Sequence, residues 1–400
     1  MKKGVLKNLF NSVLQETGND QRKAGNIVSQ RLDNLFKAGK VEPEDFNFTQ
    51  MANELIPQLQ DLDKNDAVEV ANAVRSSQFP TISRVVISNT IMKAYELHME
   101  GVDKLVSEAN ASRTTHETMA GFTDLEGPEM RLEGMSYEET NFGEKDVTIY
   151  MADFGRTISI TREALFNDRT GQLLKNARTI GEKAGQHRAQ MIIETIEVAP
   201  RSAFKEPSNG SRAFVYKGTA HQAPVFYNAT NHTTIDGRIN KNLVTSNGLT
   251  NYTNIQAALL LAKQMVDMNG DKIVVTPNTL LVPPDLEVIA WQIINGASFS
   301  PVGQGKDEAV KIYHTGNPYG KGGMATFEPM SSRFLSSTST WFLGDFKKQL
   351  TWLWVYRPST QSLAASAEKA FYNNIVVTYK FSYHGGVGHE DYVNIIKNTA

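Results

Sequence analysis

The 400-residue sequence contains no cysteine. This absence excludes disulfide bonds, thiol nucleophiles and cysteine-ligated zinc sites, and it fits a reducing compartment. An excess of charge of either sign is missing too, because 41 Lys and Arg residues stand against 43 Asp and Glu residues, for a formal net charge of -2. Without a global basic field, a chain does not grip nucleic acid strongly through counterion release. Any contact with DNA is therefore expected to be local or weak.

Long hydrophobic runs are also missing. No uncharged apolar stretch reaches the roughly 18 residues that a membrane span needs. The chain begins Met-Lys-Lys, but Lys7, Asn8 and Asn11 interrupt the apolar core that a signal peptide requires. We therefore expect a soluble protein that folds in the cytoplasm and has no membrane partner.

Motifs of known chemistry are incomplete in this chain. The glycine-rich NPYGKGG (317–323) lacks the spacing of a phosphate-binding loop, and His116-Glu117 lacks the second histidine of a zinc protease. DLDKND (61–66) lacks the glycine of a calcium loop, so a solvated acidic turn is favoured. GGVGHED (385–391) groups His389 with two acids, and a loop is favoured there over a metal site. We predict no catalytic residue, no cofactor and no metal, and hence no enzyme.

The informative patterns in the sequence are those of helices and strands. Residues 1–108 read as helices with breaks at Pro43 and Pro57, and 79–96 is expected to be a helix, with a strand as the alternative. Helical periodicity then fades, and residues 147–152 and 156–161 alternate like half-buried strands. A polar, mostly acidic insert precedes them. A long hairpin with a charged tip fits this pattern, and such an arm is too thin to bury a core of its own.

A long helix is expected within residues 160–200. Asn167, Asp168 or Thr170 can cap it, an apolar stripe from Leu173 to Met191 follows, and Pro200 ends it after about seven turns. Gly181 and Gly185 fall on consecutive turns, where each costs about 1 kcal/mol in an exposed helix. Their presence indicates the close approach of another backbone.

The remainder mixes loops, strands and helices. Residues 201–250 and 314–323 read as loops, with short strands in the first, and a helix is expected from Thr253 to a stop at Asn269-Gly270. KIVVT (272–276), TLLV (279–282), WFLGDF, LTWLWVY and NNIVVTYKFSYH read as strands. In TLLVPPDLEVIAWQI (279–293), Val282 should end a strand and the second proline should open a helix. The fold class is therefore α+β.

The order of these features resembles the major capsid proteins of tailed bacteriophages, whose fold is called the Hong Kong ninety-seven type. The most specific stretches are GRTISITREALFND (155–168), similar to the junction of an extended loop with a spine helix, and LLVPPDLE (280–287), similar to a joint in the axial domain. Together with FPTISRVVISNTIMKAYE, NPYG and WFLGD they span about residue 79 to the C-terminus.

The resemblance implies a role for each segment: a helical N-terminal region and arm in 1–111, an extended β-hairpin loop in 112–162, a peripheral domain with the spine helix in 163–250, an axial domain in 251–345, and a return to the peripheral domain in 346–400. It also implies pentamers and hexamers of this chain that form an icosahedral or prolate head around double-stranded DNA. Portal, scaffold and decoration proteins are the further partners. Candidate inter-subunit contacts are Glu138, Glu139, Phe142, Glu144, Lys145, Arg156 and Arg162.

Two alternatives remain at this stage. An encapsulin-like compartment would share the fold, and the long N-terminal region argues mildly against it. A cytoplasmic enzyme with an unrecognised site would be a protein of another class. Some relatives lose an N-terminal segment by proteolysis, and we expect residues 1–75 to be retained here as an arm or small added domain. The resemblance places the chain in the virion, after assembly in the host cytoplasm.

Overall fold

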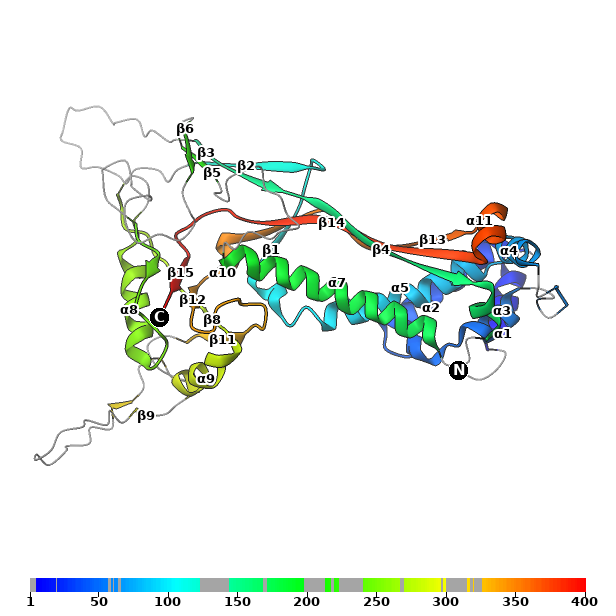
Figure 1. Cartoon of the computed structure of the whole chain (residues 1–400), viewed down its shortest axis with the longest axis horizontal. Helices are drawn as coiled ribbons and strands as arrows, with labels where there is room; N and C mark the ends of the chain where they lie inside the picture. The colour runs from blue at the N-terminus through cyan, green and yellow to red at the C-terminus, as the bar shows by residue number, and fades with distance from the viewer. Residues whose placement is uncertain are drawn as a thin grey trace, which may run out of the picture. The chain divides into compact units, whose positions relative to one another are not determined.

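The computed structural model describes residues 5–18, 20–56, 59, 61–63, 66–122, 144–167, 171–197, 213–216, 219–222, 240–266, 270–295, 298–299, 315–316, 319 and 326–400. The chain divides into two compact units. Unit 1 consists of Met1–Met99, Ala152–Arg188 and Tyr356–Gly385, and unit 2 of Glu100–Met151, Ala189–Val355 and Gly386–Ala400. Both units combine helices with sheets, so the predicted α+β class is confirmed (Figure 1).

The first part of unit 1 is helical, as predicted. Its elements are α1 (Val5–Glu16), α2 (Gln21–Lys37), the 3-10 helix η1 (Pro43–Asp45), α3 (Phe48–Leu55), α4 (Ala67–Ser76) and α5 (Phe79–Leu97). Short polar side chains start three of the helices, because Asp20, Asn47 and Asp66 accept hydrogen bonds from backbone N–H groups of the first turns of α2, α3 and α4. Asp66 closes the DLDKND segment, so that segment ends in a helix cap.

Unit 1 also contains one end of a mixed sheet. The sheet has the order β1-β13-β14-β4, and in unit 1 β4 (Ala152–Thr161) pairs antiparallel with β14 (Ile375–His389), from Thr161 opposite Ile375 to Ala152 opposite Gly385. Two short helices, α6 (Arg162–Asn167) and α11 (Ala367–Asn373), flank these strands in sequence. The side chains of Tyr379, Phe381 and Tyr383 are buried on one face of β14.

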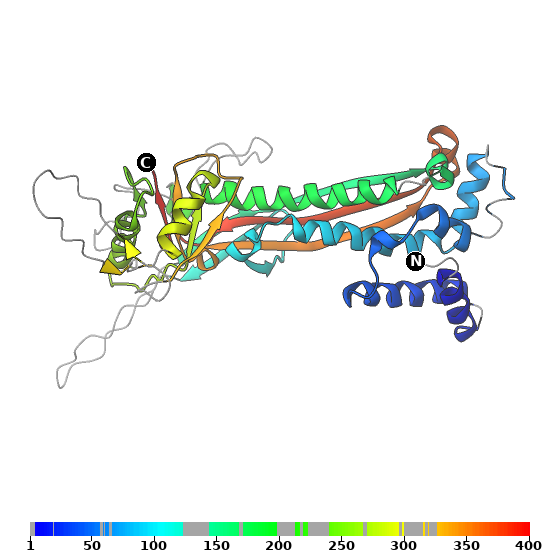
Figure 2. The same ribbon diagram turned by 90° about the horizontal axis from the view of Figure 1, so that it is seen from below.

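The predicted long helix is α7, which spans Gln172–Glu197. Figures 1 and 2 both show α5 and the unit 1 part of α7 running side by side along this sheet. The strand alternative for residues 79–96 is wrong. Pro80 fits the first turn of α5, and the buried side chains from Phe79 to Tyr95 recur at helical spacing.

Unit 2 contains a five-stranded sheet of order β11-β8-β12-β15-β7. These strands are β11 (Glu328–Ser331), β8 (Thr279–Val282), β12 (Trp341–Gly344), β15 (Ile395–Asn398) and β7 (Leu243–Val244). Two helices, α8 (Tyr252–Gln264) and α9 (Glu287–Asn295), pack on it through one apolar cluster that includes Ile255, Leu280, Leu343 and Ile396. Trp341 is fully buried in this cluster, and its indole N–H donates to the Asn247 carbonyl at 2.7 Å.

Unit 2 contains an antiparallel strand pair, or stem, inside the segment for which a hairpin is predicted. β2 (His116–Phe122) pairs with β3 (Glu144–Tyr150), and the predicted tip falls in residues 123–143, which lie outside the described residues. β5 (Ala213–Tyr216) and β6 (Thr219–Gln222) widen the stem to a four-stranded sheet of order β2-β3-β5-β6. The sequence did not predict this widening. The further elements of unit 2 are η2 (Val102–Leu105), β1 (Ser107–Asn110), η3 (Pro284–Leu286), β9 (Ser298–Phe299), β10 (Thr315–Gly316) and α10 (Phe346–Gln349), and β13 (Leu350–Ala364) begins in this unit.

The double proline acts as the sequence predicts. β8 ends at Val282, Pro283 is extended with φ -70° and ψ 162°, and Pro284 opens the 3-10 turn η3 that leads into α9. Ala290 and Ile293 are buried, and Leu286 and Ile289 pack partly buried against the same cluster. The joint therefore turns the chain from a buried strand directly into a helix that covers the same core.

Three predictions for other segments are wrong. α8 ends at Gln264 instead of Asn269-Gly270, because the Asn240 side chain bonds both the N–H and the C=O of Val266. KIVVT is not a strand, since only Lys272 pairs, in an isolated bridge with Val266. Residues 385–389 are not a loop but the end of β14. Glycine is needed at both positions in this part of β14. A Cβ at Gly386 would lie 2.0 Å from the Tyr150 carbonyl oxygen, and one at Gly388 would lie 2.5 Å from Ile149 Cγ1.

Among the helices of the described ranges, none has the length and apolar character needed to cross a membrane.

Candidate functional site

In unit 1, the backbones of α5 and α7 approach each other closely at two glycines. A Cβ at Gly181 would lie 2.2 Å from the Ile91 carbonyl oxygen, and one at Gly185 would lie 2.4 Å from the Tyr95 carbonyl oxygen. Only glycine therefore allows the two backbones to approach this closely. The prediction that another backbone approaches these glycines is confirmed, and the partner is α5 of the same chain.

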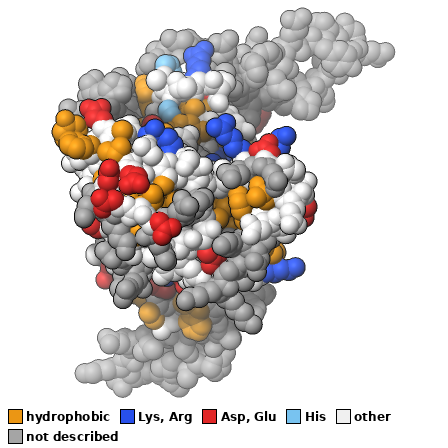
Figure 3. Space-filling model, turned by 90° about the vertical axis from the view of Figure 1, so that its right-hand side faces the viewer, with side chains coloured by type: hydrophobic (Ala, Val, Ile, Leu, Met, Phe, Trp, Pro, Cys, Tyr) orange, Lys and Arg blue, Asp and Glu red, His pale blue; other side chains and the backbone are white. Residues whose placement is uncertain are grey.

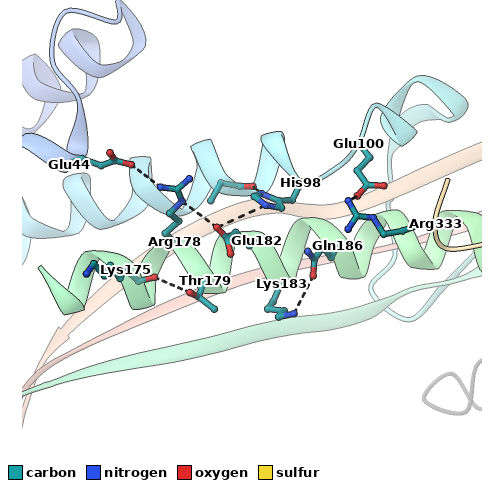
Figure 4. Close-up of polar contacts among 11 residues, drawn as sticks. Glu44, His98, Glu100, Lys175, Arg178, Thr179, Glu182, Lys183, Gln186 and Arg333 are labelled. Carbon is teal, nitrogen blue, oxygen red and sulfur yellow. Dashed lines mark hydrogen bonds and ion pairs between the residues drawn. The ribbon is translucent and has the colours of Figure 1, made fainter. Parts of the chain in front are cut away.

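A chain of polar contacts runs along the same helix pair (Figure 4). Arg178 of α7 lies 3.2 Å from Glu44 through Nη1 and 3.2 Å from Glu182 through Nε. His98, at the end of α5, lies 4.0 Å from Glu182 and hydrogen-bonds to the Ala94 carbonyl through Nδ1. Arg178 is half exposed, so solvent weakens these ion pairs, and each contributes well under about 1 kcal/mol.

Hydroxyl groups link the helix pair to the sheet. The Ser83 hydroxyl of α5 bonds the Tyr379 hydroxyl of β14 at 2.7 Å, and His187 of α7 bonds the Tyr383 hydroxyl at 3.0 Å. Burial raises the pKa of Tyr379, because the phenolate would lose its hydration, and the Ser83 hydrogen bond opposes that change only partly. Tyr379 therefore stays neutral. Within unit 1, hydrogen bonds join the layer formed by α5 and α7 to the sheet beneath it.

The predicted contact residues fall into three groups. Glu138, Glu139 and Phe142 lie outside the described residues. Glu144 and Lys145 begin β3 in unit 2, with Phe122 and Gly121 of β2 as their Cα partners.

Arg156 and Arg162 belong to unit 1. Arg156 is exposed on β4, at the edge of the sheet, which is a position open to a neighbouring molecule. Arg162 is the first residue of α6, and its guanidinium lies 3.0 Å from the carboxylate of Glu163. Its backbone N–H donates to the Asn374 carbonyl, so Arg162 also ties α6 to the start of β14.

Exposed apolar side chains mark further candidate contact surfaces that the sequence did not reveal. In unit 1, Phe371 and Tyr372 of α11 are 70% and 75% exposed, and their rings contact edge to face. Figure 3 faces the end of unit 1 where α11 lies and shows hydrophobic side chains beside acidic ones at its upper left. In unit 2, Leu260, Val274, Val288 and Trp291 are exposed. Aromatic residues in such positions are typical anchors of protein interfaces.

The histidine and carboxylate motifs of the sequence serve structural roles where they are described. His389 is fully buried, its Nδ1 faces the Gln349 amide at 3.0 Å, and its Nε2 lies 2.9 Å from the Thr195 carbonyl oxygen. Gln349 also accepts a hydrogen bond from the Asn394 N–H, so this histidine fixes the end of β14 within unit 2. Over the described ranges, no three His, Asp or Glu side chains form a group that could hold a metal ion. Each unit therefore presents exposed surfaces on a packed core of its own.

Comparison with known proteins identifies the family of this chain. A family model described as phage capsid protein matches residues 143–398, which is more than half of the chain and runs from the start of β3 into the last strand, β15. The match includes α7, α8 and α9 but not the N-terminal helices α1 to α5. A comparison of the sequence with curated proteins found no match.

Solved structures of similar fold include three from phages. The structure named for Gordonia phage Cozz is 12% identical, with 75% of this chain and 86% of that chain covered and a TM-score of 0.42. The capsid of Ralstonia phage GP4 is 12% identical, with 74% and 86% covered and a TM-score of 0.43. The structure named for Mycobacterium phage Bobi is 11% identical, with 75% and 90% covered and a TM-score of 0.43.

Proposed function

The chain belongs to the family of phage capsid proteins, and from this premise we propose that it is the major capsid subunit of a tailed phage, assembling through pentamers and hexamers into an icosahedral or prolate head. The observation that carries the proposal is the family match over residues 143–398, which includes the hairpin strand β3, the long helix α7 and the Pro-Pro joint. A capsid protein has a structural role. It works by contacts between many identical surfaces, each modest on its own and strong together.

The parts of the chain divide this work in the proposed account. Residues 112–162 form the extended loop, residues 163–250 and 346–400 the peripheral domain with α7 as its spine, and residues 251–345 the axial domain. What supports this division is the order of the elements: a hairpin stem, then α7, then the helices α8 and α9 on one sheet. Residues 1–111 add helices that pack on α5, as the buried side chains Val28, Leu32 and Phe48 indicate.

The contacts between subunits involve the loop and the sheet edge. We place Glu138, Glu139, Phe142, Glu144 and Lys145 on the part of this loop that reaches a neighbouring subunit, and we propose that Arg156 and Arg162, at the other end of the same segment, also contact a neighbouring copy. Support for this comes from charge, because the segment Glu133 to Asp146 carries five acidic residues and one basic residue, whereas Arg156 is exposed on an edge strand. Edge strands present backbone groups that readily pair with another chain.

Packaged double-stranded DNA is the proposed content of the shell, held by weak, non-specific contact. The formal net charge of -2 supports this, because a strongly basic subunit would bind the genome tightly through counterion release. Portal, scaffold and decoration proteins are the proposed further partners. The proposed location is the virion, reached after assembly in the host cytoplasm.

The full chain expressed alone tests this proposal. Sedimentation velocity should separate a pentamer or hexamer species or a much larger particle, and negative-stain electron microscopy of the same fractions should show rings or closed shells of uniform curvature. A compact monomer or dimer at every salt and protein concentration would refute the proposal. Shells that exclude DNA but enclose a specific protein would identify a cargo compartment instead.

A further inference from the structure

Unit 2 carries two exposed apolar surfaces of opposite charge. The first, which we call the acidic face, consists of Pro284, Asp285, Glu287, Val288 and Trp291 on η3 and α9. Val288 is 63% and Trp291 60% exposed, and with Pro284 they follow helical spacing on the side of α9 that points away from the core. From Pro283 to Asn295 the sequence contains two acidic residues and no basic one. An exposed tryptophan on such a face is typical of a surface that binds another protein.

The second surface, which we call the basic end, lies where α8 stops. It consists of Lys241, Leu260, Lys263, Lys272 and Val274, with Leu260 58% and Val274 86% exposed. Contacts at the end of α8 hold its parts together: the Asn240 side chain bonds the Val266 backbone, Lys272 forms a β-bridge with Val266, and the Ile273 N–H donates to the Met265 carbonyl. Asp271 is the one acidic residue described there. The segments joined at Met265 and Val266 therefore carry three exposed lysines and two exposed aliphatic side chains.

The two surfaces occupy different ends of one sheet. α9 packs on β11 and β8, which begin the strand order β11-β8-β12-β15-β7, whereas α8 packs on β15 toward its other end. Both helices cover the same apolar cluster, so the distance between the surfaces is fixed by the core of unit 2. Figure 1 shows α8 and α9 as separate helices on this sheet. A two-fold contact would pair each surface with the other twice in a closed dimer, whereas a head-to-tail contact pairs them once at each interface and repeats around a ring.

We propose that the acidic face of one copy packs against the basic end of the next copy, so that identical copies close into a ring. This inference rests on the proposed function and names the surfaces through which the subunits of a ring recognise one another. Trp291 and Val288 supply the apolar anchor, because an exposed tryptophan has a large area to bury. The lysines opposite Asp285 and Glu287 set the direction of the contact, since like charges meet if two acidic faces or two basic ends approach.

Charge reversal on each surface tests the pairing. The first variant combines Asp285→Lys with Glu287→Lys, and the second combines Lys263→Glu with Lys272→Glu. Each places like charges across every contact, so each should raise the protein concentration needed for ring formation by at least about tenfold. A single chain with all four changes restores opposite charges and should form rings again. Trp291→Ala, with the charges intact, should weaken ring formation by about 30-fold.

Mixing the two reversed variants gives the sharper result. Contacts between unlike variants are attractive in both directions, whereas contacts between like variants are repulsive. The mixture should therefore form rings in which the variants alternate, and alternation closes only with an even number of subunits. Native mass spectrometry should find hexamers with three copies of each variant and no pentamers.

Matched controls separate this inference from the proposed function. Asp61→Lys and Lys40→Glu reverse exposed charges in unit 1, outside its helices, and should leave ring formation unchanged. Circular dichroism of every variant shows whether it is folded. If the wild-type chain forms no ring or shell, the proposed function fails. If the wild type assembles and the reversed variants assemble equally well, or if the mixture yields pentamers, the pairing of these two surfaces is wrong while the proposed function stands.

Discussion

Adding one methyl group to α7 at Gly181 or Gly185 tests the helix contact at the centre of unit 1. In an exposed helix, Gly→Ala stabilises by about 1 kcal/mol, because alanine loses less backbone entropy. Here the new Cβ atoms would lie 2.2 Å from the Ile91 carbonyl oxygen and 2.4 Å from that of Tyr95. Both obstacles are backbone atoms of α5, so the helices must separate by about 1 Å to restore ordinary contact.

The expected cost follows from these distances. Overpacking of this kind costs about 1–3 kcal/mol, and a rigid backbone obstacle favours the upper half of that range. After subtraction of the gain in helix propensity, Gly181→Ala and Gly185→Ala should each lower the free energy of unfolding by about 1–2 kcal/mol. The two changes act on one contact, so their effects in a double variant should not add.

Gly25→Ala in α2 is the matched control. Its Cβ would lie 2.3 Å from Oε1 of Gln78, but that atom is the far end of a flexible side chain that can move away. Gly25→Ala should therefore leave the free energy of unfolding unchanged or raise it by up to about 1 kcal/mol. Urea unfolding of the full chain, below the concentration at which it assembles, measures all three values. Hydrogen exchange of the α5 and α7 amides assigns the loss to this contact. Stabilisation by Gly181→Ala or Gly185→Ala equal to the control would refute the close approach.

Three further changes probe other contacts. Arg178→Ala removes exposed ion pairs to Glu44 and Glu182, so its cost should stay below about 1 kcal/mol and vanish in high salt during urea unfolding. Burial raises the pKa of Tyr392 to about 12, above its unfolded value of about 10. The contribution of Tyr392 to the free energy of unfolding is therefore complete below pH 10 and is lost as pH rises toward 12. Between these pH values, the free energy of unfolding of Tyr392→Phe should fall less steeply than that of the wild type. Trp341→Phe leaves a cavity and an unpaired carbonyl and should cost about 2–4 kcal/mol by urea unfolding; a loss below 1 kcal/mol would contradict the packing of that core.

Local patterns in the sequence predict several elements of the fold. The apolar stripe from Leu173 to Met191 predicts α7, and the two glycines predict that a backbone approaches it, because no side-chain argument explains glycine in a helix interior. The double proline predicts the turn from β8 into α9. These features are local, so a single stretch of sequence contains the physical cause.

The wrong predictions concern segments whose fate depends on distant residues. α8 ends early because Asn240 takes the hydrogen bonds of Val266, and Asn240 precedes the helix by twelve positions. Gly386 and Gly388 read as loop residues in sequence, but they allow Tyr150 and Ile149 to approach β14. Neither cause is visible without knowing which segments meet.

The candidate contact surfaces show the same limit. Helical spacing places Leu286, Ile289, Ala290 and Ile293 on one face of η3 and α9, and this face packs on the core, but the sequence does not mark Val288 and Trp291 outside that face as a contact surface. Arg156 was predicted as a contact residue, and its exposure on the edge strand β4 is compatible with that role. The loop residues Glu138, Glu139 and Phe142 stay predictions.

A cryo-electron microscopy reconstruction of particles formed by the full chain tests the central claim most directly. The account predicts closed shells in which subunits surround five-fold and six-fold axes, with density for the paired helices α5 and α7 in every subunit and with contacts between α9 of one copy and the end of α8 of the next. Particles without such axes, or a discrete small oligomer that never closes, would contradict it.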